Sequence, residues 1–170
     1  MKITKFLALI LVAAGLSAIA PAAQASPMTR DFIRNATVGN GFEIMSSRIA
    51  LQRSQNPEVR DFAQRMIDDH RRADEELRST IMSSRYAMRG MPNNLDGRHR
   101  AMLNQLQRAQ GPRFDRLYVR MQTQGHDEAV RLFSNYARGG DNPALRDYAA
   151  RTLPTIEEHE QHIRQIRMGH

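Results

Sequence analysis

Apolar residues recur every three or four positions along most of the chain, which is the spacing of an amphipathic helix. One such stripe consists of Val59, Phe62, Ala63, Met66, Ala73, Leu77 and Ile81. No stretch alternates apolar and polar residues with the two-residue period of a strand. The pattern therefore predicts an all-α protein.

Pro and Gly residues divide this pattern into five helices. The predicted helices cover about residues 27–54, 57–88, 95–109, 113–137 and 143–167. The breaks near residues 55 and 140 are short, so each flanking pair of long helices must fold back on itself. The predicted fold is a four-helix bundle of two antiparallel hairpins, with a short extra helix in the long middle connection.

A weak internal repeat links the two hairpins. The segment NPEVRDFAQR (residues 56–65) matches NPALRDYAAR (residues 142–151) at most positions. Both copies begin the second helix of a predicted hairpin, with Asn as N-cap and Pro as first helical residue. Two interpretations remain open. Either a good helix start is used twice, or two related hairpins pack about a pseudo-twofold axis.

The first 25 residues have the three parts of an export signal. They combine two early lysines, a short apolar run over residues 6–14 and a small-x-small cleavage site at residues 23–25. The run is too short to span a bilayer. We expect cleavage between Ala25 and Ser26, a single bundle domain over residues 26–170, and a periplasmic or secreted protein with no transmembrane segment in the mature chain.

Composition excludes some kinds of chemistry. The 170 residues contain no cysteine, which rules out disulfides, thiol nucleophiles and a lipid-anchored cysteine. The formal net charge is +7, from 25 basic and 18 acidic residues, and the only two lysines lie in the predicted signal. The mature chain is therefore Arg-rich, which raises the question of an anionic partner.

The placement of the charges argues against nucleic acid as that partner. Seven acidic residues precede an arginine by four positions, the favourable orientation for an ion pair on a helix surface. These pairs are Asp61/Arg65, Asp68/Arg72, Asp74/Arg78, Asp96/Arg100, Asp127/Arg131, Asp147/Arg151 and Glu160/Arg164. They predict solvated outer faces, and no nucleic-acid motif is present. Weak binding to an anionic envelope surface remains open.

Each of the four long helices carries one ionisable residue on its apolar face. His70 continues the stripe of the second helix, and His126 and His159 lie in line with apolar residues of the last two helices. Glu43 lies at the centre of a face of mostly small residues on the first. All four are near the middle of their helices at 1.5 Å per residue, which predicts one central polar layer.

Two interpretations of this layer remain open, because buried carboxylates and imidazoles need partners. A Glu–His hydrogen-bond network could fix the helix register. Alternatively, one zinc, iron or copper ion could be bound by these four side chains, a set that suits all three metals. In that case Asp74, one turn from His70, could orient the His70 ring.

The remaining histidines and the methionines add no further ligand. His162 is expected at the rim of the layer, and His99 and His170 are expected at the surface. The methionines are scattered rather than gathered in Met-x-x-Met runs, which is typical of core filler. No phosphate loop, dinucleotide fingerprint or nucleophile elbow is present, so no catalytic residue is predicted.

Three segments carry a resemblance to a known family. Residues 32–70, 114–133 and 145–159, with FAQRMIDDH, the Gln122/His126 pair and LPTIEEH within them, resemble the exported bacterial family called domain of unknown function 4142. The resemblance implies a ferritin-like four-helix bundle without an established activity. Ferritin-like di-iron proteins use Glu-x-x-His on two helices. Here Ile67 and Ile156 stand at those Glu positions, which leaves too few carboxylates for a di-iron centre.

These features predict an uncharacterised, non-catalytic periplasmic bundle protein. In the first interpretation it binds one transition-metal ion in an envelope or stress-related role. In the alternative it is an envelope interaction module, whose Glu/His layer is purely structural and whose Arg-rich surface binds a partner or an anionic polymer.

Overall fold

The computed structural model describes residues 25–84 and 95–166, and within these ranges every regular element is a helix. The helices are α1 (Pro27–Arg53), α2 (Pro57–Ser83), α3 (Gly97–Arg108), α4 (Gly111–Gly139) and α5 (Pro143–Gln165). The predicted all-α class is therefore confirmed for this part of the chain.

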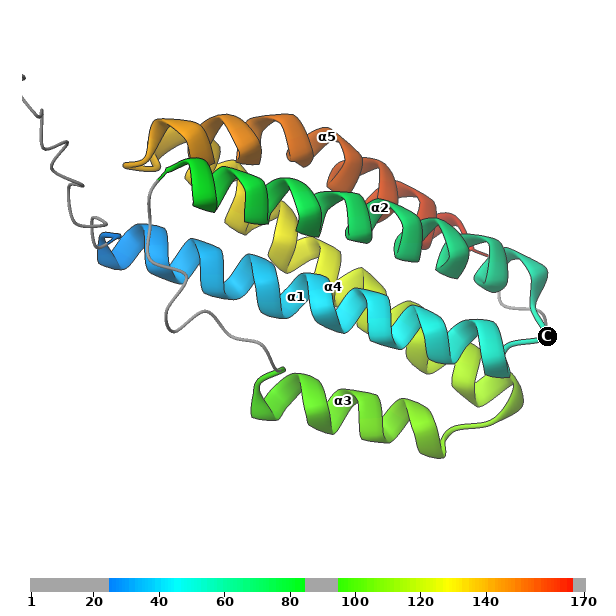
Figure 1. The fold of residues 1–170 in the computed structure, drawn as a ribbon. Coiled ribbons are helices and arrows are strands. Elements are labelled where there is room, and N and C mark those ends of the chain that lie inside the picture. The colour runs from blue at the N-terminus through cyan, green and yellow to red at the C-terminus, as the bar shows by residue number, and fades with distance from the viewer. Residues whose placement is uncertain (1–24, 85–94, 167–170) are drawn as a thin grey trace, which may run out of the picture.

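The four long helices lie side by side, and α3 lies along one side of them (Figure 1). α1 packs on α2 and α4, while α5 packs on α4 and α2. Figure 1 shows α1 and α5 running in one direction and α2 and α4 in the other. The short α3 carries the chain back along the molecule, from the end where α2 stops to the end where α4 begins.

Both copies of the internal repeat begin a helix in the expected way. The Asn56 Oδ1 atom accepts a hydrogen bond from the backbone N–H of Glu58 at 2.9 Å. Asn142 Oδ1 accepts one from Leu145 N–H, also at 2.9 Å. Each bond satisfies a backbone donor that the first turn of a helix leaves free. Their role as caps is thus established, while the pseudo-twofold axis stays a prediction.

The predicted helix bounds differ from the structure mainly at the ends. α4 is longer at both ends than the predicted 113–137. α2 ends at Ser83, because Ser84 closes the last turn with its N–H on the carbonyl of Thr80, and residues 85–88 lie outside the described part. The predicted signal lies outside it too, apart from Ala25, as does His170. None of the described helices combines the length and the apolar character that crossing a membrane requires.

The buried apolar residues form two clusters, one on each side of the predicted polar layer. The first cluster is built around Phe62, Met66, Phe114, Tyr118 and Ile163. The second is built around Phe32, Leu77, Phe133, Tyr148 and Ile156. Along α2, for example, Met66 belongs to the first cluster and Leu77 to the second, with His70 between them. The two clusters give the bundle its hydrophobic stabilisation and leave a polar section in the middle.

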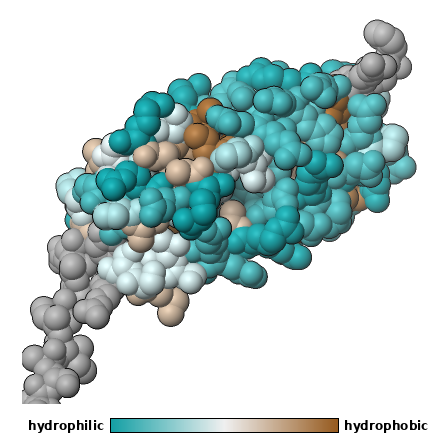
Figure 2. All heavy atoms as spheres, turned by 90° about the horizontal axis from the view of Figure 1, so that it is seen from above, coloured by the Kyte–Doolittle hydropathy of each residue, from teal (hydrophilic) through white to brown (hydrophobic). Residues whose placement is uncertain are grey.

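Surface charges pair both along single helices and between neighbouring helices. Only Asp74/Arg78 and Glu160/Arg164 of the seven predicted pairs form an ion pair within the described residues. Arginines also reach across to a neighbouring helix, in the pairs Arg65–Glu158, Arg151–Glu76, Arg164–Asp127 and Arg98–Glu128, so that Arg164 makes both kinds of pair. The five other intrahelical pairs were therefore predicted wrongly. A four-residue spacing cannot report a closer acid, which lies on another helix for Arg65 and Arg151 and three residues away for Arg72. Hydrophilic residues predominate on the face shown in Figure 2.

Candidate metal centre

Three histidines from three helices meet in the polar section of the bundle. One ring nitrogen each of His70 (α2), His126 (α4) and His159 (α5) lies within 4.8 Å of the other two. The ring centroids are 5.6 to 6.1 Å apart. The His126 and His159 side chains are buried and His70 is partly buried. The structure thus brings together three of the four residues predicted for the polar layer.

Each ring directs one nitrogen outward, to an oxygen atom that can only accept a hydrogen bond. His126 Nδ1 lies 2.8 Å from the carbonyl oxygen of Gln122, one turn earlier on α4. His70 Nδ1 lies 2.7 Å from Oδ1 of Asn40 on α1. An acceptor at this distance places the proton on the facing nitrogen and fixes the tautomer of the ring.

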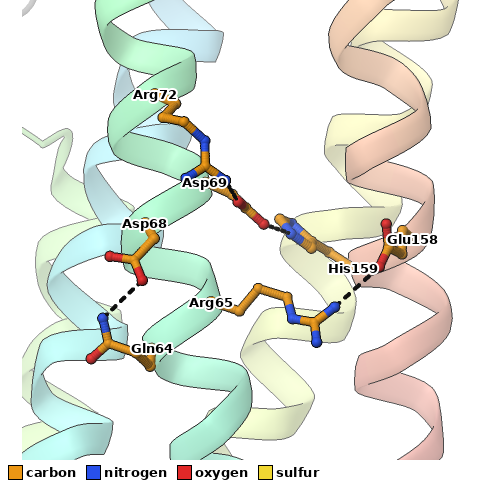
Figure 3. Close-up of polar contacts among 7 residues, drawn as sticks. All are labelled: Gln64, Arg65, Asp68, Asp69, Arg72, Glu158 and His159. Atoms are coloured by element: carbon orange, nitrogen blue, oxygen red, sulfur yellow. Dashed lines mark hydrogen bonds and ion pairs between the residues drawn. The ribbon is translucent and has the colours of Figure 1, made fainter.

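The third ring is held by a charged partner. His159 Nε2 lies 2.8 Å from Oδ2 of Asp69, which reaches it from α2 (Figure 3). Asp69 also contacts Arg72 one turn further along α2. This bond places the proton of His159 on Nε2. His159 therefore presents Nδ1 to the interior, whereas the other two rings present Nε2.

The inward nitrogens are buried and have no hydrogen-bond partner in the described part of the chain. They are Nε2 of His70, Nε2 of His126 and Nδ1 of His159. Because the opposite nitrogen of each ring carries the proton, each inward nitrogen has a free lone pair. Three lone pairs converging in a buried space form a ready-made set of ligands for a cation.

Burial also keeps these rings neutral. It lowers the pKa of His126 to about 4. It lowers the pKa of His70 well below the ordinary value, and a positive charge on either neighbouring ring would lower it further. The pKa of His159 is lowered by burial as well, although Asp69 opposes the change. A metal ion binds the neutral imidazole, so the triad is in the binding form at neutral pH.

Glu43 lies next to this group but is not part of it. Its side chain is buried, its Oε2 atom has no hydrogen-bond partner, and burial raises its pKa to about 8 against the effect of a hydrogen bond with Gln122. Gly125, adjacent to His126, leaves it room, since a Cβ atom there would lie 2.5 Å from Glu43 Oε1. The sequence therefore correctly predicted that Glu43 is buried. The side chains whose ligand atoms lie within 4.8 Å of one another are, however, the three histidines, without Glu43.

One cavity of about 480 Å³ connects all four residues. All five helices contribute to its walls. The histidine triad and Glu43 line it together with small residues of α1 and α4 and with charged side chains near the start of α3. The polar section is therefore not filled by protein atoms.

The comparison with family models gives one match. The family described as "Domain of unknown function (DUF4142)" matches residues 14–166. The chain belongs to this family. No protein of curated function matches it. The resemblance expected from the sequence is thereby confirmed. The description of the DUF4142 family names no activity that could be assigned to this protein.

Solved structures of a protein named CopM share the fold of this DUF4142 protein. CopM in the Cu(II)-bound form is 23% identical, with a TM-score of 0.66 over 80% of this chain and 93% of that chain. CopM in an Ag-bound form obtained by co-crystallization is 24% identical, with a TM-score of 0.65 over 80% and 92%. The Cu(I)-bound form is 23% identical, with a TM-score of 0.66 over the same shares. At this identity the likeness shows the helical fold alone.

Two expectations for surrounding residues need correction. Asp74 does not orient His70, because its carboxylate pairs with Arg78 at 2.7 Å. The group that bonds the His70 ring is instead the side chain of Asn40. His99 is not a surface residue, since its side chain is only 16% exposed, is bonded to Asp96 and packs on Phe42 with 5.1 Å between ring centroids. Both corrections depend on residues of α1, Asn40 in the first case and Phe42 in the second, which the spacing within one helix does not report.

Asn40 and Asp69 are the orienting residues that sequence reasoning missed. Both lie on helices other than that of the histidine they hold, so no spacing within one helix could reveal them. Gln122 could have been found, because it lies one helical turn before His126 on the same helix. His162, expected at the rim, is partly buried, and its ring lies 5.3 Å from that of Phe62, outside the triad.

Proposed function

We propose that this DUF4142 protein is a periplasmic, non-catalytic metal-binding protein with a ferritin-like bundle of two antiparallel hairpins. One transition-metal ion would be held by His70, His126 and His159. The observation that carries the proposal is the set of three buried ring nitrogens that converge without a hydrogen-bond partner. Asn40, Asp69 and the Gln122 carbonyl would act as the orienting groups that metal-binding histidines usually have.

A purely structural histidine network would be arranged differently. In such a network the rings would satisfy each other or Glu43, since a buried polar atom without a partner costs about 1–3 kcal/mol. Here each ring makes its hydrogen bond outward and leaves its inner nitrogen free. A cation at the centre would satisfy all three nitrogens at once, which favours the metal site over the structural alternative.

Copper is the metal we propose first. Imidazole ligands suit copper, zinc and iron, and copper binds most tightly among the divalent ions of this series. CopM, which shares this fold, has copper-bound and silver-bound forms, and this supports placing copper first. Glu43 would lie near the ion as an acidic neighbour rather than as one of the three close ligands.

The alternative function, docking of an Arg-rich surface on an anionic polymer, has less support. Several of the surface arginines form ion pairs with acidic residues of neighbouring helices, including Arg65, Arg98, Arg151 and Arg164. Arginines paired in this way present less uncompensated charge to a polymer. We therefore do not propose it as the main function.

The test is the copper content of purified protein. We expect about one copper ion per chain in the wild type, and loss of binding in the double variant His70→Ala/His126→Ala. The matched control is His162→Ala, which removes a nearby partly buried histidine outside the triad and should keep the ion. Far-UV circular dichroism checks that each variant is folded. Equal copper content in the double variant and the wild type would overturn the proposal.

A further inference from the structure

The cavity beside the triad leads from the interior to the surface of the bundle. At its inner side it is lined by the three histidines. Its walls include Gly39 and Ala129, which have little or no side chain. On α3 and α4 it reaches Arg98 and Glu128, whose side chains are 47% and 38% exposed and joined by a bidentate ion pair. A small solute could therefore reach the triad from solvent along this cavity.

The triad supplies three ligands and no more. No further histidine or carboxylate among the described residues joins the group whose ligand atoms lie within 4.8 Å of one another. Copper(II) and zinc ions take at least four ligands, and sites with three protein ligands leave the next position to a water molecule or another small ligand. Glu43 lines the cavity but stays outside the close group.

We propose that the metal ion keeps one coordination position open toward this cavity, and that a small monoanion from solvent binds there. This inference rests on the proposed function. An anion is favoured because the imidazole ligands are neutral and leave the charge of the cation largely uncompensated. Of the two arginines that line the same cavity, Arg98 is ion-paired with Glu128, and Arg131, which makes no ion pair among the described residues, adds positive charge along the route. At about 480 Å³ the cavity is also far larger than the roughly 30 Å³ occupied by one water molecule.

Gly39 provides a way to close this route without touching a ligand. It lies within α1 and lines the cavity, and a Cβ atom built there meets no heavy atom within 4 Å. A larger side chain at this position would therefore extend into the open space. Gly139, the last residue of α4, also has no heavy atom within 4 Å of its Cβ position but does not line the cavity. It is a matched control for the same substitution.

The experiment is an azide titration of copper(II)-loaded protein, followed by the azide-to-copper charge-transfer absorption. Copper content is measured first on each sample. A wild type that binds no copper would contradict the proposed metal binding, whereas the azide titration tests the open coordination position separately. We expect the absorption band in the wild type and in Gly139→Leu. In Gly39→Leu we expect full copper content and an azide affinity at least about tenfold weaker.

Two results would overturn the inference while leaving metal binding intact. One is copper-loaded wild type that shows no azide band, which would mean that no coordination position is open. The other is an unchanged azide affinity in Gly39→Leu, which would mean that the anion does not use this cavity. If Gly39→Leu does not fold, the smaller steps Gly39→Ala and Gly39→Val should weaken azide binding in that order, and equal affinities would overturn the inference in the same way.

Discussion

Asp69 Oδ2 lies 2.8 Å from His159 Nε2, so a carboxylate of α2 fixes the tautomer of a histidine of α5. The same bond directs His159 Nδ1 toward the other two rings, where it has no partner. Asp69 is itself held by Arg72, and the three residues form one chain of contacts between the two helices (Figure 3). A carboxylate behind a metal-binding histidine both orients the ring and makes it a stronger ligand.

The first prediction concerns this carboxylate. Asp69→Ala should weaken copper binding about 10- to 100-fold, the usual effect of removing a group that orients a metal-binding histidine. Asp68→Ala is the matched control, because Asp68 is the neighbouring acid on α2 and, among the described residues, bonds only to the exposed Gln64 on its own helix (Figure 3). Competition titration against a copper chelator measures both. Equal affinities for the two variants would show that Asp69 does not support the site.

The second prediction concerns the space that Gly125 leaves for Glu43. Gly125→Ala places a Cβ atom 2.5 Å from Glu43 Oε1, and the buried carboxyl group must move. We expect a net loss of about 1 kcal/mol or less in the free energy of unfolding, because the end of the flexible Glu43 side chain can shift into the cavity it lines and alanine improves helix propensity. Gly39→Ala, where the new Cβ meets open space, should instead stabilise the protein by about 0.5–1 kcal/mol.

A double-mutant cycle tests the cause of this loss. In a Glu43→Ala background the same Gly125→Ala change should be much less harmful, because the clashing carboxyl group is gone. Urea denaturation of the four proteins gives the interaction free energy. Additive effects of the two substitutions would mean that contact with Glu43 is not the reason for the loss.

The third prediction is a pH dependence of the metal-free protein. The folded state raises the pKa of Glu43 from 4.5 to about 8, so the folded protein holds a proton that the unfolded chain has already released. The stability that Glu43 contributes is full below pH 4.5 and is lost as the pH rises toward 8. Glu43→Gln removes this loss. Its stability relative to wild type should therefore grow between pH 5 and 8, by at most about 1.4 kcal/mol per pH unit.

His126 titrates in the opposite sense and serves as an internal comparison. Its pKa is lowered to about 4, so its contribution is present above pH 6.5 and is lost as the pH falls toward 4. That loss occurs in both proteins and cancels in the difference. Glu75→Gln, on the exposed side of α2, controls for removing one negative charge. A stability difference between Glu43→Gln and wild type that does not change with pH would contradict the prediction.

The fourth prediction concerns processing. Cleavage after Ala25 would leave α1 whole, because the helix begins at Pro27 and its cap is Ser26, whose side chain accepts the N–H of Thr29 at 3.1 Å. Mass spectrometry of protein recovered from a periplasmic extract should give a chain that begins at Ser26. Recovery of the full-length chain in the cytoplasmic fraction would show that the first 25 residues do not act as an export signal.

The sequence by itself determined the helices and their buried faces. Apolar spacing and the Asn-Pro caps are local signals, since each is set by residues within one or two helical turns. They correctly placed His70, His126 and His159 on inward faces, and Glu43 as a buried acid. Helical rise also located all four near mid-helix, and therefore in one section of the bundle.

Only the tertiary structure decided how these groups are arranged. Asn40 and Asp69 hold histidines of other helices, Arg65 pairs with Glu158 rather than with Asp61, and Glu43 stands beside the triad instead of within it. Each of these outcomes depends on the rotation and relative height of neighbouring helices. Those quantities follow from packing among side chains far apart in the sequence, and no periodicity within a single helix contains them.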